Sequence, residues 1–251
     1  CRNTATGMYS LRANTTGCYN TASGYAALYN NTTGILNTAV GDHAMGLNTT
    51  GGCNTATGQA SLYSNTTASY NTAYGYSSLQ YNTTGASNTA SGHQALFSNT
   101  TGAKNTASGR YALRGNTTGT VNTATGKDAL KSNTTASFNT ASGYQALYLN
   151  TTGCTNSAFG TEALKKNTTG CRNTAVGSIS LYFNTTGCNN TSTGHQALKC
   201  NTTASDNTAY GYTALMTNTA SNNTAVGAAA LRSNTTGTSN QAFGCAALCA
   251  T

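Results

Sequence analysis

The sequence contains neither proline nor tryptophan, and only 6% of its 251 residues are charged. Soluble domains usually have about 25% charged residues. Four acidic residues and three histidines leave few groups for acid–base catalysis. No stretch approaches the roughly 20 apolar residues of a membrane span. The composition therefore indicates neither an ordinary enzyme nor a membrane-spanning protein, and we expect a non-enzyme without metal or cofactor.

The abundant residues, 51 Thr, 32 Asn and 28 Gly, belong to a tandem repeat. The pentad Asn-Thr-Ala-x-Gly begins at Asn3 and recurs every 17 residues as far as Asn207. One residue is then deleted near Asn218, so the last two copies begin at Asn223 and Asn240. Fifteen copies of NTAxGxxALxxNTTGxx cover the chain. The repeat predicts a single repeat-built domain, residues 1–251, without a separate linker or tail.

The repeat separates constant from variable positions. Position 1 is Asn and position 5 is Gly in every copy, and position 9 is Leu except at Met45. Position 3 is Ala except at Ser192, whereas positions 6, 7, 10, 11, 16 and 17 vary freely. Constant small, Asn and Leu positions indicate an interior, and variable polar positions indicate a surface.

Seventeen residues are too few for the helix-containing repeat families. They suit one coil of a narrow β-solenoid with two or three short strands, the first in N-T-A, the second in A-L and the third in N-T-T. Glycine at position 5, and glycine or alanine at position 15, would form the corners. The sequence thus predicts an all-β fold, a β-solenoid (β-roll) of about fifteen 17-residue coils. At about 4.8 Å per coil, the stack would be roughly 70 Å long.

Stacked coils would place the position-1 asparagines directly above one another. Each side-chain amide can both donate and accept, so the column would form a hydrogen-bonded ladder. This structural ladder comprises Asn3, Asn20, Asn37, Asn54, Asn71, Asn88, Asn105, Asn122, Asn139, Asn156, Asn173, Asn190, Asn207, Asn223 and Asn240.

The Asn-Thr-Ala-x-Gly unit resembles the short N-S/T-x-x-G coils in the heads of trimeric autotransporter adhesins, the YadA-like family. The longer NTAxGxxALxxNTTG unit is similar to tandem repeats of bacterial surface proteins and phage tail-fibre-like proteins. The resemblance covers the whole chain. It implies a left-handed β-roll, an extracellular location, and adhesion or fibre formation.

The Asn-Thr-Thr triplet at positions 12–14 matches the N-glycosylation acceptor pattern. It has two interpretations: a glycan site, or a second ladder of asparagines with two threonines suited to a strand. The threonines at positions 2, 13 and 14 also offer O-linked sites. The candidate N-glycosylation sites are Asn14, Asn31, Asn48, Asn65, Asn82, Asn99, Asn116, Asn133, Asn150, Asn167, Asn184, Asn201 and Asn234.

Five of the nine cysteines occupy position 16: Cys1, Cys18, Cys154, Cys171 and Cys188. Neighbours at one position lie one strand spacing apart, within the Cα separation that a disulfide tolerates. We expect a Cys1–Cys18 bond and one bond within the second group. Because Cys245 and Cys249 lie in the last copy, cysteines near both ends suit cross-links between subunits. The alternative is idle or buried thiols.

Position 10 carries half of the 12 basic residues of a chain whose net charge is +8: Arg12, Arg114, Lys131, Lys165, Lys199 and Arg232. Aromatic residues alternate with them at the same position: Tyr29, Tyr63, Phe97, Tyr148 and Tyr182. This column is either a stripe that binds glycans or polyanions by stacking and ion pairing, or a solvated edge that discourages lateral aggregation. We expect the second, and no nucleic-acid partner.

The repeat runs from Cys1 to Thr251 without a recognisable polar cap. Uncapped solenoids belong to longer chains or stack end to end. We therefore expect the structural subunit of an extracellular filament or fibre at a cell or virion surface, a head-to-tail homopolymer that carries covalent glycans if the acceptor sites are used. The alternative is an adhesin or tail-fibre shaft that binds glycans or receptors. Ice binding by the threonine columns is a third hypothesis, opposed by the aromatic residues at position 4.

Overall fold

The computed structural model describes residues 1–249. It divides into two compact units, Cys1–Ala124 and the remainder from Thr125 onward, called here the N-terminal and C-terminal units. Both are built entirely from short parallel strands and turns, and the described residues contain no helix. The predicted all-β fold, a β-solenoid of 17-residue coils, is confirmed.

Each coil contains one three-residue strand at repeat positions 2–4. The N-terminal unit contains β1 (Thr4–Thr6), β2 (Thr21–Ser23), β3 (Thr38–Val40), β4 (Thr55–Thr57), β5 (Thr72–Tyr74), β6 (Thr89–Ser91) and β7 (Thr106–Ser108). The boundary falls within β8 (Thr123–Thr125). The C-terminal unit contains β9 (Thr140–Ser142), β10 (Ser157–Phe159), β11 (Thr174–Val176), β12 (Thr191–Thr193), β13 (Thr208–Tyr210), β14 (Thr224–Val226) and β15 (Gln241–Phe243).

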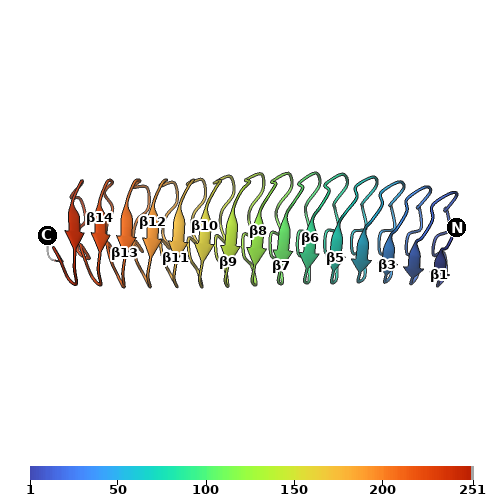
Figure 1. The fold of residues 1–251 in the computed structure, drawn as a ribbon, viewed down its shortest axis with the longest axis horizontal. Helices are drawn as coiled ribbons and strands as arrows, with labels where there is room; N and C mark the ends of the chain where they lie inside the picture. The colour runs from blue at the N-terminus through green and yellow to red at the C-terminus, as the bar shows by residue number, and fades with distance from the viewer. Residues whose placement is uncertain (250–251) are drawn as a thin grey trace. The chain divides into compact units, whose positions relative to one another are not determined.

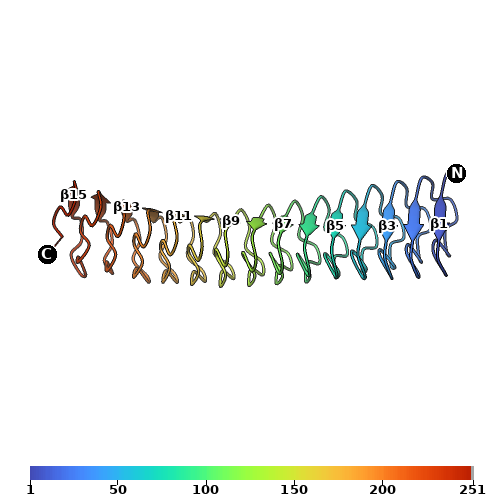
Figure 2. The same ribbon diagram turned by 90° about the horizontal axis from the view of Figure 1, so that it is seen from below.

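Within each unit, strands pair in parallel with the next strand along the chain, without a shift in register (Figures 1 and 2). Thr4 lies opposite Thr21, and Ala5 opposite Ala22. The register survives the deletion, because Thr208 still lies opposite Thr224. The missing residue is therefore absorbed in the turns that precede β14.

The expectation of two or three strands per coil is wrong, since positions 7, 9 and 17 adopt a left-handed backbone. In the second coil, Ala26 and Leu28 have φ of 51° and Leu36 has φ of 58°. A strand needs consecutive extended residues, and left-handed residues at positions 7 and 9 prevent them on the second side. On the third side the chain bends at positions 13 and 14, as at Thr32 and Thr33. The two remaining sides of the coil are therefore turns.

These turns are nevertheless hydrogen-bonded from coil to coil. The backbone N–H of Leu28 donates to the carbonyl oxygen of Ala44, at 3.0 Å. On the third side, the N–H groups of Thr32, Thr33 and Gly34 all donate to the carbonyl of Thr49, at 3.0–3.2 Å. Every side of the coil thus contributes to cohesion, although only one side is a strand.

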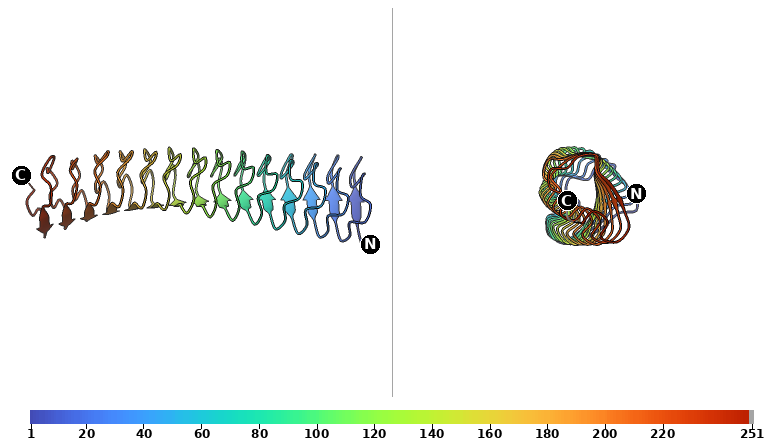
Figure 3. Two further views of the ribbon diagram at one scale, coloured as in Figure 1. Left: turned by 90° about the horizontal axis from the view of Figure 1, so that it is seen from above. Right: turned by 90° about the vertical axis from the view of Figure 1, so that its left-hand side faces the viewer.

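Seen end-on, each coil encloses a narrow interior (Figure 3). Ala22, Ala27 and Leu28, at positions 3, 8 and 9, are completely buried in the second coil. The one serine at position 3, Ser192, bonds to the serine at position 8 of the preceding coil, Ser180, with 2.6 Å between the hydroxyl oxygens. Small apolar side chains thus fill a thin core, as the constant positions predict.

The position-5 glycine turns the corner after each strand, as expected. Gly126 has φ of +124°, a backbone conformation that side chains other than hydrogen rarely allow. A Cβ atom added there would lie 2.7 Å from the carbonyl oxygen of Gly143. The glycine at position 15 differs, because alanine replaces it naturally at Ala68, Ala136 and Ala204.

We expect Gly126→Ala to lower the free energy of unfolding by about 1–3 kcal/mol, since it adds backbone strain and a steric clash. In a chain of this size, that is a decrease of about 2–4 °C in Tm for each kcal/mol. Thermal unfolding followed by far-ultraviolet circular dichroism measures it. Gly153→Ala, at position 15, is the comparison. A Cβ atom there would lie 2.4 Å from the carbonyl oxygen of Gly170, but its backbone is not left-handed and other coils carry alanine at this position, so its loss should be smaller. Equal losses from the two substitutions would show that the corner does not require glycine.

Candidate functional site

The position-1 asparagines form the expected ladder, but they bond mainly to backbone groups. The Oδ1 atom of Asn37 accepts the backbone N–H of Asn54, at 3.0 Å. The Nδ2 atom of Asn37 donates to the carbonyl of Gly51, at position 15 of the same coil, at 2.8 Å. Each side chain therefore closes its own coil and holds the next coil in register.

The position-12 asparagines form a second ladder from side chain to side chain. The Nδ2 atom of Asn48 donates to Oδ1 of Asn31 in the preceding coil, at 2.8 Å. The same Nδ2 atom donates to the carbonyl of Gly51, at 3.0 Å. The position-15 carbonyl thus accepts both asparagines of its coil, so the two ladders meet at one oxygen.

The candidate N-glycosylation sites are the members of this second ladder. Those from Asn31 to Asn201 are fully buried, Asn234 is 2% exposed, and Asn14 is half-buried. A glycan would have to be attached to the Nδ2 atom that donates to the ladder. The geometry favours the structural interpretation of these asparagines. Exposed hydroxyl groups occur instead on the position-14 threonines, such as Thr33, Thr50 and Thr67.

The deletion near Asn218 breaks the second ladder at one step, whereas the first ladder continues, since the N–H of Asn223 still donates to Oδ1 of Asn207 at 2.9 Å. The Nδ2 atom of Asn218 donates to the carbonyl of Ala220 instead of to the preceding coil. The buried Oδ1 atom of Asn201 therefore has no hydrogen-bond partner, whereas the equivalent Oδ1 atoms of other coils accept from the next coil. The buried Nδ2 atom of Asn207 also lacks a partner. A buried polar group without a partner costs about 1–3 kcal/mol, so this coil is a weak point of the C-terminal unit.

The cysteines divide into one disulfide and seven free thiols. Cys1 and Cys18 are bonded, with a Cα–Cα distance of 4.8 Å. Cys154, Cys171 and Cys188 are free, although the Sγ atoms of Cys154 and Cys171 are only 3.1 Å apart. No bond is present within this group, where we expected one. Cys53, Cys200, Cys245 and Cys249 are also free.

The position-16 thiols serve as hydrogen-bond acceptors for backbone groups. The N–H of Cys154 donates to Sγ of Cys171, at 3.0 Å, and the N–H of Cys171 donates to Sγ of Cys188, at 3.1 Å. The N–H of Cys188 donates to the serine hydroxyl of Ser205 in the same way. Burial raises the pKa of the Cys171 thiol more than the N–H of Cys154 lowers it, so this thiol stays protonated at neutral pH.

Cations and aromatic rings of adjacent coils meet along the edge formed by positions 6, 7, 10 and 11. The Arg12 guanidinium lies over the rings of Tyr9 and Tyr29, each centroid at 5.3 Å. The ammonium group of Lys165 lies 5.6 Å from the ring centroid of Tyr182. The alternation seen in the sequence therefore produces contacts between cations and rings.

Two of these lysines also form ion pairs within the C-terminal unit. Lys131 lies 3.1 Å from Asp128, and Lys165 lies 2.6 Å from Glu162. Burial lowers the pKa of Lys131, but the hydrogen bond and charge of Asp128 raise it by more, so the net pKa is raised. Both cations already have partners within the protein, which favours a solvated edge over an open basic stripe.

In residues 1–249, acidic residues and histidines form no cluster larger than a pair. The structure brings Asp42 into contact with its sequence neighbour His43. Across residues 1–249, no group of three or more His, Cys, Asp or Glu side chains is arranged to hold a metal ion. Nor does that part of the chain contain a helix with the length and apolar character of a membrane span.

Comparison of the chain with known protein families, with curated protein sequences and with solved structures finds no match.

Sequence reasoning missed two features of the surface. Position-7 side chains such as Tyr9 and His43 join the position-6 and position-10 side chains of neighbouring coils, because the left-handed turn brings these positions together. Position 10 also contains one glycine, Gly46, among larger residues. That exception is visible in the sequence, but its consequence requires the packing of adjacent coils.

We expect the insertion of one Thr between Thr219 and Ala220 to restore a 17-residue coil. Asn218 and Asn207 would then bond as their counterparts do, which should raise the free energy of unfolding by about 1–3 kcal/mol for each restored group. Chemical denaturation measures this change. The same insertion between Thr202 and Thr203 makes an 18-residue coil and should destabilise the protein. A gain from both insertions, or from neither, would contradict the role of the deletion.

We expect iodoacetamide at pH 8 to modify Cys53 before Cys171. Cys53 is exposed, whereas Cys171 is partly buried and its pKa is raised, and only the thiolate reacts. Because a raised pKa delays deprotonation, the modification rate of Cys171 should still increase as the pH rises above 9. Peptide mapping by mass spectrometry measures both rates. Equal rates at pH 8 would contradict the assigned environment of Cys171.

Proposed function

We propose that the chain is the structural subunit of an extracellular filament or fibre on a cell or virion surface, in which copies stack end to end. The proposal rests on one observation: the same contacts recur from coil to coil without a shift in register. Asn37 bonds to Asn54 as Asn156 bonds to Asn173. Because the 17-residue coils of both units offer the same donors and acceptors, a coil of a second copy could continue the ladders with the same bonds.

The exposed edge of the first strand supports stacking of copies. All three residues of β1 are exposed, including Ala5, whereas the equivalent Ala22 of β2 is completely buried. A strand with one free edge readily accepts another strand. A second copy placed against β1 would cover Ala5 in the way that the coils cover Ala22.

Secretion and a sugar coat belong to the proposal. The Cys1–Cys18 disulfide fits an oxidising compartment. Exposed position-14 threonines such as Thr33 and Thr50 are the accessible sites for O-linked glycans, which would keep a chain with few charges soluble. The likeness to bacterial surface proteins, tail fibres and YadA-like heads is part of this hypothesis, and the proposal assigns the chain no catalytic role.

The alternative is an adhesin or tail-fibre shaft that binds glycans or receptors. Exposed aromatic side chains favour it, among them Tyr70 and Tyr212, which are 68% and 61% exposed. Ice binding is a weaker hypothesis. It needs an uninterrupted flat threonine surface, and Tyr74 and Phe243 project from the strands at 62% and 68% exposure.

We expect negative-stain electron microscopy of dilute native protein to show filaments many times longer than the roughly 70 Å estimated for fifteen coils. Ala5→Glu should abolish them, because it places a charge where the next copy would bury an alanine. Thr4→Glu is the matched control, since this neighbouring side chain points outward and its charge should leave filaments intact. Discrete particles in the unmodified protein would refute the filament, and a trimeric mass would favour the adhesin.

A further inference from the structure

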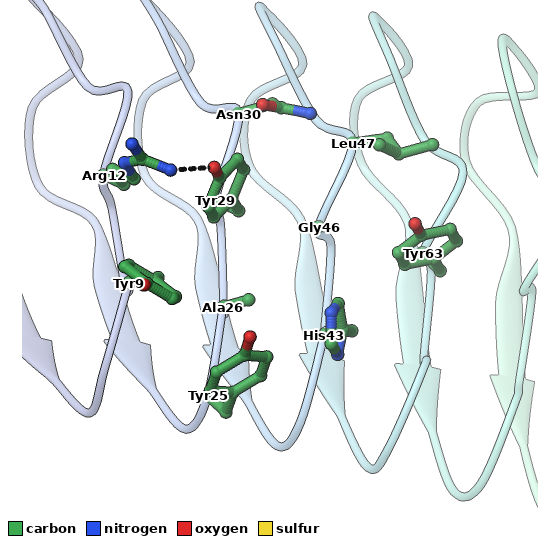
Figure 4. A pocket seen from close by; sticks show the side chains of 10 residues that line it. All are labelled: Tyr9, Arg12, Tyr25, Ala26, Tyr29, Asn30, His43, Gly46, Leu47 and Tyr63. Carbon is green, nitrogen blue, oxygen red and sulfur yellow. Dashed lines mark hydrogen bonds between the residues drawn. The ribbon is translucent and has the colours of Figure 1, made fainter.

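We propose that the N-terminal unit binds a carboxylated saccharide, such as a uronic acid oligomer, in a cavity on its aromatic edge. The cavity has a volume of about 350 Å³, within the range of small-molecule sites. Its walls come from four consecutive coils (Figure 4). This site goes beyond the filament proposal and does not depend on it.

Gly46 lines the cavity. It occupies position 10, where the preceding coil has Tyr29 and the following coil has Tyr63. A Cβ atom at Gly46 would lie 2.9 Å from the ring of Tyr63. Every other coil carries a larger side chain at position 10. At Gly46 the Tyr63 ring instead packs against the backbone, and both residues line the cavity together with Tyr29.

Aromatic rings surround this space in fixed orientations (Figure 4). The ring centroids of Tyr9 and Tyr25 are 5.8 Å apart, those of Tyr25 and His43 are 5.1 Å apart, and those of His43 and Tyr63 are 6.1 Å apart. The planes are tilted by 58–69°, so the rings do not close into one stack. The negative face of a ring attracts the polarised C–H groups of a pyranose. Ring walls with a few polar groups therefore suit a sugar.

The charge of the walls selects an acidic sugar. Arg12 lines the cavity, and no acidic residue lines it. The Arg12 guanidinium contacts the Tyr29 hydroxyl and two rings but, among the described residues, no carboxylate. Asp42 lies in the adjacent cavity and is paired with His43. A planar guanidinium binds carboxylates through two parallel hydrogen bonds, so the ligand we infer carries a carboxylate.

Neutral polar groups complete the match with a saccharide. The tyrosines and Asn30 lie on the same edge of the N-terminal unit (Figure 4). Tyrosine hydroxyls and the asparagine amide can each donate to and accept from sugar hydroxyls. The adjacent cavity is lined by Gln59 and Gln80 as well as Asp42. Further sugar units could therefore extend along the edge from the first one.

Isothermal titration of the full chain with a galacturonic acid trisaccharide, and with the neutral galactose trisaccharide, tests the proposal. We expect the acidic trisaccharide to bind about tenfold more tightly or better, the size of a hydrogen bond to a charged group. Arg12→Gln should remove this preference. Gly46→Gln should abolish binding of both, and the fold should tolerate it, because Gln80 occupies the same position in another coil.

Arg114→Gln is the matched control, because Arg114 is also a position-10 cation over an aromatic ring but lies outside the cavity. It should leave both affinities unchanged. Three results would overturn the proposal: no binding of either sugar, equal binding of both, or acidic-sugar binding that Gly46→Gln leaves intact. Filaments formed by Gly46→Gln would show that the loss of sugar binding is separate from assembly.

Discussion

The position-15 carbonyl oxygen is the group on which each coil depends. In the third coil, Asn37 and Asn48 both donate to the carbonyl of Gly51, from opposite ends of the coil sequence. A carbonyl has two lone pairs, so one oxygen can accept both amides. The remaining oxygens of the two asparagines then accept donors of the next coil. The two asparagine side chains and the Gly51 carbonyl therefore close a coil and join it to its neighbour.

This arrangement explains how so small an apolar core is sufficient. Alanine and leucine fill the interior of the coil, and they bury little area compared with the aromatic residues of ordinary domains. Buried amides with all their partners avoid the cost of an unsatisfied polar group. Where the chain lacks one residue, Asn201 and Asn207 lose partners, which shows how closely the ladders depend on coil length.

The constant positions of the repeat hold the coils together, whereas the variable positions form the surface that a ligand would contact. The constant asparagines hold the coils, so substitutions at positions 6, 7, 10 and 11 leave the ladders intact. Side chains there contact one another within a coil, as Arg12 contacts Tyr9, and between neighbouring coils, as Tyr25 contacts His43. A single residue at one of these positions, such as Gly46, can line a local cavity. A filament built on such coils could acquire a binding site without altering its packing.

Periodicity alone determined the coil length, the parallel stacking, the buried face of Asn and Ala, and the glycine corner. Residues with the same spacing must lie over one another once the first two coils pair, so each of these features follows from the repeat. The tertiary structure decided the left-handed turns at Ala26 and Leu28, because neither residue type favours that backbone by itself. It also decided that the position-12 asparagines are buried and that the Tyr63 ring packs against Gly46 in the wall of a cavity, since both depend on side chains of adjacent coils.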